Sequence, residues 1–345
     1  MGYVIGSFNL KDFGEKALQV RDLYKIAEII KNENFDVVAL QEIFLYKIQG
    51  KDDTNPIEKL KNILGFSWEY EWADAENETG SHEGYAFLWN SNRLRLASDD
   101  DGKPFKPRIW KKINKYDIKR RPFYARFTPT DEGGPFFEIR LICIHTYFGN
   151  IEKNSNVGWT AKEQREFNHT IRQLEIENVL TKIYPEIEDT VYGKFRPSYT
   201  IVLGDYNLRI KKLKGEEDTN NNNVPYLETD ENNTVIVEEE WDGWGNAIIS
   251  DKTKRIVTVQ SEFTTLKQQS TTNTDNSEQQ EFPGGYANDY DHFSYNVNIE
   301  RNREVYLNYQ RIDAVNKYYN GDFKSYHKNV SDHVPIKMEI ELRKD

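Results

Sequence analysis

The sequence is poor in cysteine, in basic charge and in long apolar runs. Cys143 is the only cysteine, so an intrachain disulfide is impossible, and its place in an apolar run predicts a core thiol rather than a nucleophile. No apolar run approaches the roughly 20 residues that would span a membrane. The first ten residues lack the basic and long apolar parts of a signal peptide. We therefore expect a cytoplasmic rather than a secreted protein, and no membrane partner.

The charge balance is acidic. Lys and Arg number 46 against 57 Asp and Glu, which gives a formal net charge of −11. This argues against a protein that coats nucleic acid through a broad basic surface, because such binding depends on cations that neutralise phosphates. It does not argue against an enzyme that gathers carboxylates around a cation. With 37% apolar residues, the 345-residue chain has enough material for a folded core.

Apolar runs bounded by turn residues predict strands along the whole chain. They lie at Val4–Phe8, Phe35–Leu40, Tyr85–Trp89, Glu138–Ile144, Tyr199–Leu203, Phe293–Val297 and Val334–Leu342. Two segments instead have apolar residues at i, i+3, i+4 and i+7, which predicts amphipathic helices. These stripes are Leu23, Ile26, Ala27 and Ile30, then Ile176, Val179, Leu180 and Ile183.

Two strongly polar stretches interrupt the pattern, near residues 215–233 and 268–281. Their composition cannot bury much apolar surface, so we interpret them as surface insertions rather than as linkers between domains. The strands after them complete the pattern set by those before. The sequence thus predicts one domain spanning residues 1–345.

Each predicted strand carries a polar side chain at one end. These residues are Asn9, Glu42, Glu83, His145, Asp205 with Asn207, Asp291, and Asp332 with His333. One such residue alone would be read as a turn former or a hydrogen-bonded core histidine. As a set, hard carboxylate and amide oxygens suit Mg²⁺, Mn²⁺ or Ca²⁺, and histidines offer proton transfer near neutral pH. This combination is typical of phosphoester hydrolysis.

The ordered motifs SFNL, DVVALQE, EGYAFLW, IHT, GDYN, YDHF and SDHVPI resemble those of the endonuclease/exonuclease/phosphatase superfamily. The resemblance covers residues 3 to about 342 and is strongest to the deoxyribonuclease I-like branch. It implies an α+β fold, a four-layered α/β/β/α sandwich in which two mainly antiparallel sheets are flanked by helices.

The same resemblance implies a role for each residue. Glu42, Asn9 and Asp332 would be metal ligands, for Mg²⁺ or else Mn²⁺ or Ca²⁺, while Asp205 and Asn207 would complete the catalytic site. Glu83 would orient His145, and Asp291 would orient His333. Arg121 would bind the substrate phosphate, and the basic stretch of Arg209, Lys211 and Lys212 could follow a phosphate backbone.

The sequence also departs from the deoxyribonuclease I-like pattern. Phe44 stands where that branch carries an arginine that enters the DNA minor groove, and the structural disulfides of the branch cannot form. A rival alignment would assign Asp313 instead of Asp291, but Asp313 lies close to the SDH motif. Alternation along the strand places His292 on the face opposite Asp291, as a supporting or surface group.

We expect a divalent-metal-dependent phosphodiesterase, and specifically a nuclease whose substrate is DNA rather than RNA. The acidic charge and the missing groove arginine keep a second reading open, a hydrolase of small or lipid phosphoesters on the same fold. A binding module without activity is the third. The sequence gives no basis for predicting a protein partner.

Overall fold

The structure is a computed structural model. It describes residues 2–45, 55–75, 82–99, 101–111, 118–130, 137–147, 159–192, 197–212, 226–229, 240–241, 247–248, 256–259, 262–267, 285–296, 298–301 and 305–342.

The first large sheet has six strands around one parallel pair. Its order is β16 (Val305–Arg311), β17 (Ile336–Leu342), β1 (Gly2–Gly14), β2 (Val37–Phe44), β4 (Gly84–Asn90) and β3 (Trp68–Asp74). Only β1 and β2 run parallel, and the other neighbours are antiparallel. The ends of β1 and β2 therefore meet at the same edge of the sheet.

The second large sheet repeats this plan. Its order is β14 (Ile256–Val259), β15 (Asp291–Asn296), β9 (Ser198–Asp205), β8 (Glu138–His145), β7 (Phe123–Pro129) and β5 (Leu94–Leu96), with β6 (Arg108–Ile109) also paired to β7. Here β8 and β9 form the parallel pair, with His145 beside Asp205, and the other pairs are antiparallel.

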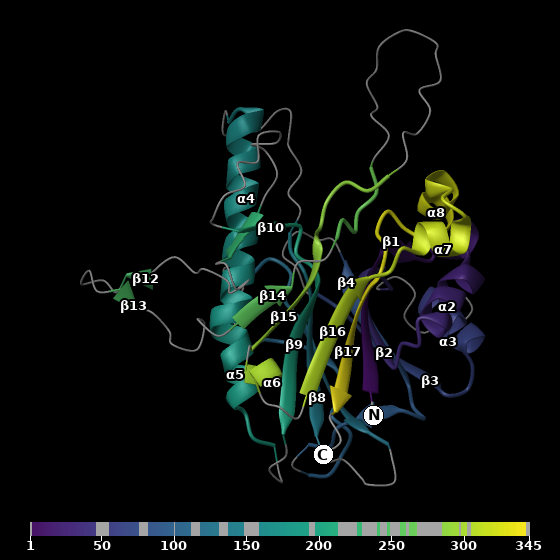
Figure 1. The fold of residues 1–345 in the computed structure, drawn as a ribbon, viewed down its shortest axis with the longest axis horizontal. Helices are drawn as coiled ribbons and strands as arrows, with labels where there is room; N and C mark the ends of the chain where they lie inside the picture. The colour runs from purple at the N-terminus through teal and green to yellow at the C-terminus, as the bar shows by residue number, and fades with distance from the viewer. Residues whose placement is uncertain are drawn as a thin grey trace.

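Helices cover the outer face of each sheet (Figure 1). On the first sheet lie α1 (Ala17–Val20), α2 (Leu23–Asn32), α3 (Pro56–Leu64), α7 (Ala314–Tyr319) and α8 (Phe323–Asn329). On the second lie α4 (Ala161–Asn178), a π-helical turn (Val179–Ile183) and α5 (Tyr184–Asp189), with the short α6 (Asn298–Arg301) nearby. The four layers of the predicted sandwich are thus confirmed.

Alternating side chains along the strands build three apolar layers. On β2, Val37 and Ala39 face the second sheet, whereas Val38 and Leu40 pack under the helices of the first sheet. On β8, Ile142 packs instead under α4, the π-helical turn and α5. The central layer between the sheets holds both in register, so the strand ends of one sheet stay opposite those of the other.

The predicted elements are present with small shifts in their bounds. All seven predicted strands exist, and the first apolar stripe forms α2, whose first turn is capped by the Asp22 side chain accepting from Lys25 N. The second stripe spans the end of α4 and the π-helical turn. The other strands of the two large sheets were not predicted: β3, β5, β6, β7, β14 and β16.

Two small two-stranded sheets follow β9 in the chain: β10 (Arg209–Lys212) pairs with β11 (Tyr226–Thr229), and β12 (Glu240–Trp241) pairs with β13 (Ala247–Ile248). Of these strands only β11 falls within a predicted insertion. Apart from β11, the insertion predicted at 215–233 lies outside the described residues, and so does the whole of 268–281. In the part of the chain that the structure describes, no helix has the length and apolar character needed to cross a membrane.

Candidate active site

The polar side chains at the strand ends gather at one edge of the sandwich. The parallel pairs bring Asn9 and Glu42 from the first sheet opposite His145 and Asp205 from the second. Asp291 begins β15 directly beside Asp205. The sequence-predicted residues thus come together because each sheet has its parallel pair at its centre.

The backbone at this edge has unusual conformations. Lys11, Asp12, Glu42 and Asn207 all have positive φ, between 46° and 60°, and the β1–β2 register shifts between Asn9 and Phe13. Such conformations cost about 1–3 kcal/mol each and persist where surrounding contacts enforce them, commonly at functional sites. One enforcing contact is the hydrogen bond from Asp12 N to Glu42 Oε2, at 3.0 Å. The strained segment therefore fixes where the Glu42 carboxylate points.

The first histidine pair is made by His145 and Glu83. The two side chains are buried and in contact through His145 Nδ1 and Glu83 Oε1. Arg120 also touches both: its Nη2 lies 2.7 Å from Glu83 Oε2, and its Nη1 lies 3.0 Å from His145 Nδ1. Because Arg120 Nη1 also donates to Thr146 O at 3.1 Å, we assign the Nδ1 proton to the bond with Glu83. Nε2 of His145 then faces the site.

Charges set the pKa values of this pair. Burial and the Arg120 charge lower the pKa of His145, but the Glu83 and Asp205 carboxylates together outweigh them, so the pKa lies above its ordinary value. Burial raises the pKa of Glu83, but His145 and Arg120 outweigh it and hold that pKa below its usual range. These shifts favour an ionised Glu83 carboxylate beside a protonated His145 imidazole.

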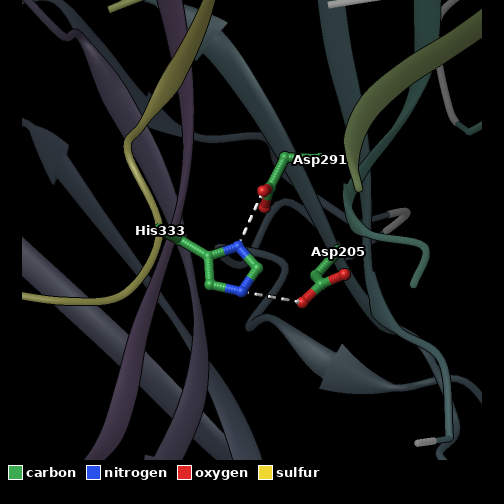
Figure 2. Close-up of side chains that lie close together, drawn as sticks. All are labelled: Asp205, Asp291 and His333. Atoms are coloured by element: carbon green, nitrogen blue, oxygen red, sulfur yellow. Dashed lines mark hydrogen bonds and ion pairs between the residues drawn. The ribbon is translucent and has the colours of Figure 1, made fainter. Parts of the chain in front are cut away.

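The second histidine lies between two carboxylates (Figure 2). His333 Nδ1 is 2.8 Å from Asp291 Oδ2, and its Nε2 is 3.6 Å from Asp205 Oδ2. Burial opposes protonation, but Asp291 and Asp205 outweigh it and raise the pKa of His333 to about 10. The Nε2 of His145 is also 3.6 Å from the same Asp205 Oδ2. Both imidazoles thus approach one carboxylate oxygen, each held from behind by its own carboxylate.

Asn9 connects the two halves of the site. Its Nδ2 donates to Glu42 Oε1 at 2.9 Å and to Asp205 Oδ2 at 3.0 Å. Burial, followed by the nearby Glu83 and Asp332 charges, raises the pKa of Glu42, although His145 and Asn9 oppose the shift. Glu42 is thus a partly buried carboxylate around which negative charge and burial outweigh the positive charge.

The donor set fits a hard divalent cation. Asp332 Oδ1 is buried and has no hydrogen-bond partner among the described residues, although Lys11 Nζ lies 2.6 Å from the other oxygen. Asp205, Asp291 and His333 offer ligand atoms that all lie within 4.8 Å of one another. An unsatisfied buried carboxylate oxygen, excess negative charge at Glu42 and mainly oxygen donors suit Mg²⁺, Mn²⁺ or Ca²⁺.

Comparison with solved structures identifies the fold. The chain aligns over 100% of its length with 99% of an endonuclease/exonuclease/phosphatase family protein from Bacteroides thetaiotaomicron, at a TM-score of 0.52 and 12% identity. The chain has the endonuclease/exonuclease/phosphatase fold. The fold predicted from the sequence, a deoxyribonuclease I-like sandwich of the endonuclease/exonuclease/phosphatase superfamily, is thereby confirmed.

Two other solved structures align at lower scores. A mannosyl-6-phosphatase from Bacteroides thetaiotaomicron matches at a TM-score of 0.47 and 12% identity, with 99% of this chain and 100% of the other covered. TDP2 from C. elegans matches at 0.48 and 15%, with 99% and 75% covered. No protein-family model matches the sequence, and no curated protein matches it significantly.

The predicted phosphate-binding residues lie in different surroundings. Arg120, which the sequence analysis missed, contacts Glu83 and His145, whereas the predicted Arg121 is its partly buried neighbour. Arg209 Nε lies 2.9 Å from Asp289 Oδ1, and its guanidinium stacks over the Phe263 ring. The side chains of Lys211 and Lys212 lie outside the described residues. The charge of Arg209 is therefore already partly neutralised by Asp289.

Asn207, the remaining predicted catalytic residue, contacts Asp205 and Thr146, the residue after His145. Its backbone N–H donates to Asp205 Oδ1 at 2.8 Å, and its Nδ2 donates to Thr146 O at 3.2 Å. The Asn207 side chain therefore couples the turn after β9 to the end of β8.

The structure excludes two alternatives left open by the sequence, namely Asp313 as the partner of His333 and a surface position for His292. Asp313 caps α7 and accepts from Tyr286 OH at 2.6 Å, so it is Asp291 that contacts His333. His292 is buried on the opposite face of β15, with Nε2 at 2.9 Å from Leu208 O, which excludes the surface role.

Proposed function

We propose that this protein is a divalent-metal-dependent phosphodiester hydrolase that acts as a nuclease, with DNA as the preferred substrate. The observation that carries the proposal is the pair of imidazoles, His145 and His333, whose Nε2 atoms each lie 3.6 Å from Asp205 Oδ2. A phosphate group bound next to this carboxylate would lie near both imidazoles. The two histidines can then serve the entering and departing oxygens of one displacement.

The proposed reaction is hydrolysis. A water oxygen bonds to phosphorus while the bond to the departing oxygen breaks. One imidazole accepts the proton of the water, and the other donates its proton to the departing oxygen. Glu83 and Asp291 keep the rings oriented through their Nδ1 contacts, which fixes the tautomers that present Nε2 to the substrate. The buried Asn207 side chain donates one Nδ2 hydrogen to Thr146 O, and its other Nδ2 hydrogen would be available for a phosphate oxygen.

Glu42, Asn9 and Asp332 are the residues that would hold the metal. When bound, a divalent cation would neutralise the charge that grows on the phosphate oxygens. Arg120 would add positive charge near the same phosphate oxygens, because its guanidinium contacts Glu83 and Thr146 O at the edge of the site.

The test is an activity screen with Mg²⁺ or Mn²⁺ over duplex DNA, single-stranded DNA, RNA and small phosphoesters, each with and without chelator. We expect metal-dependent cleavage of DNA, with losses of at least about 100-fold in His145→Ala, His333→Ala and Glu42→Gln. His82→Ala is the matched control, because His82 is an exposed histidine paired with Asp74. Intact substrates throughout would overturn the enzyme proposal, and chelator-resistant cleavage would overturn the metal proposal.

A second function is favoured by a specific observation. Arg209 is paired with Asp289, and the chain carries a net charge of −11. Both features weaken the positive surface that would bind the phosphates of a long nucleic acid. The alternative is a hydrolase of small or lipid phosphoesters that uses the same histidines. Release of phosphate from small esters without cleavage of any polymer would select it.

A further inference from the structure

Helix α4 sends two buried charged side chains toward the backbone behind the site. Arg172 and Glu175 are 5% and 3% exposed, and their i, i+3 spacing places them on one face of the helix. Burying charged groups is costly unless their hydrogen bonds are satisfied. The hydrogen-bond partners of Arg172 and Glu175 therefore indicate their role in the structure.

Arg172 bridges the ends of the two parallel strands of the second sheet. Its Nε donates to Tyr147 O, and its Nη1 donates to Asn207 O, each at 3.2 Å. Tyr147 follows His145 by two residues, and Asn207 follows Asp205 by two. One rigid guanidinium thus fixes the spacing between the segment that carries His145 and the segment that carries Asp205.

Glu175 joins a third segment to this arrangement. Its Oε2 accepts from Tyr147 N at 2.8 Å, and its Oε1 accepts from Lys119 N at 2.5 Å. Lys119 directly precedes Arg120, whose guanidinium contacts Glu83 and His145. The carboxylate therefore ties the Arg120 segment to the His145 segment, from the side of α4.

We propose that Arg172 and Glu175 are positioning residues that hold Arg120, His145 and Asp205 in their mutual geometry without touching substrate. This inference rests on the proposed function. Its physical basis is preorganisation, since a misplacement of about 1 Å at reacting groups can cost roughly 100-fold in rate. Side chains locked from behind provide the rigidity that such a site needs.

The chain offers a matched control. Arg140, on the same strand as His145 but toward its other end, is also buried, and its Nη1 donates to Ile187 O and Glu188 O of α5 at 2.5 and 3.3 Å. Arg140→Met thus removes a buried guanidinium that bridges two carbonyls away from the site. Arg172→Met removes the equivalent bridge behind it.

The experiment compares kcat, KM and Tm for Arg172→Met, Arg172→Lys, Glu175→Gln and Arg140→Met. We expect Arg172→Met and Glu175→Gln to lower kcat by roughly 10- to 100-fold while KM changes little. Arg172→Lys should restore part of kcat, because lysine can still reach one carbonyl. Arg140→Met should lower Tm to a similar extent with little change in kcat. Equal losses of kcat per degree of Tm in both Met variants would overturn the proposal.

A second readout separates this inference from the proposed function. Side-chain ¹⁵N NMR of selectively labelled histidines reports the Nδ1 contact of His145 whether or not the protein cleaves any substrate. We expect the His145 Nδ1 signal to shift in Arg172→Met and Glu175→Gln and to stay in place in Arg140→Met. An unchanged signal in the α4 variants would overturn the positioning role, even in an active enzyme.

Discussion

Lys11 and Asp332 form an ion pair at the edge of the site, with 2.6 Å between Lys11 Nζ and Asp332 Oδ2. The lysine sits at a positive φ of 46°, so the backbone is held in an unusual conformation where it makes this contact. Burial raises the pKa of Asp332, but His333 and Lys11 outweigh it and hold that pKa below its ordinary value. The ammonium thus provides part of the positive charge that this carboxylate would otherwise take from a metal ion.

Removing that ammonium should strengthen metal binding. In Lys11→Met the Asp332 carboxylate loses its cation while the side-chain volume is largely kept, so we expect Mn²⁺ to bind on the order of tenfold more tightly. Isothermal titration calorimetry measures the change directly. Lys25→Met is the control, because Lys25 pairs with Glu28 on the surface of α2 and its loss changes the net charge equally. Equal affinities in the two variants would contradict this explanation.

A glycine beside Asp205 should tolerate no side chain. Gly204 has a φ of +141°, and a Cβ added to it would lie 1.9 Å from the carbonyl oxygen of Ile144 on the neighbouring strand. Gly204→Ala must therefore separate β8 from β9, and we expect a loss of about 3 kcal/mol or more in the free energy of unfolding. Gly102→Ala, at a φ of +78° with nothing within 4 Å, should lose only about 1 kcal/mol. Urea unfolding distinguishes them, and similar losses would refute the clash.

Most of the strands were predictable because they are apolar runs, and the site was predictable because polar residues stand at the ends of these runs. The runs around Val38 and Ile142 are apolar on both faces, since each strand packs against the other sheet on one side and against helices on the other. Such runs are visible without knowledge of the pairing. Strand β7 was not predicted although it is buried throughout, and β16, with alternating and exposed positions, gives a weak signal.

The residues missed at the site depend on tertiary structure. Arg120 and Arg121 are adjacent, and nothing in their order tells which one faces Glu83. Arg172 and Glu175 lie in a helix whose sequence is polar on most of its surface, so they read as solvated charges. Their role follows from the approach of α4 to three separate segments, which no local pattern encodes. The Thr160–Glu163 capping box could, by contrast, have located the start of α4.

Cys143 should be chemically inert in the folded protein. The thiol is fully buried, and burial raises its pKa to about 12, although Gln41 Nε2 donates to Sγ at 3.1 Å. Alkylation and disulfide exchange need an accessible thiolate. We expect no reaction with a thiol reagent at mildly alkaline pH, and stoichiometric reaction in concentrated guanidinium chloride. Rapid labelling of the native protein would show that the layer between the sheets opens.

Glu33 should make stability depend on acid pH. This carboxylate follows α2 and accepts from Lys317 Nζ at 2.5 Å, Tyr318 OH at 2.8 Å and Lys337 Nζ at 2.9 Å, which ties α2 to α7 and β17. Burial raises its pKa, but the three donors outweigh burial and hold the pKa below the ordinary 4.5. A lowered pKa in the folded state means that the contribution is complete above 4.5 and is lost as pH falls through the folded value.

Glu33→Gln should therefore be less stable than wild type at neutral pH by about 1 kcal/mol, a modest value because Lys317 is half exposed. Urea unfolding from neutral pH down to strongly acidic pH should show this difference shrinking once pH falls below 4.5. Glu28→Gln, which removes an exposed carboxylate from the same helix, should show a smaller difference. If the Glu33→Gln difference stayed constant through the acid range, the carboxylate would be acting through its shape and not its charge.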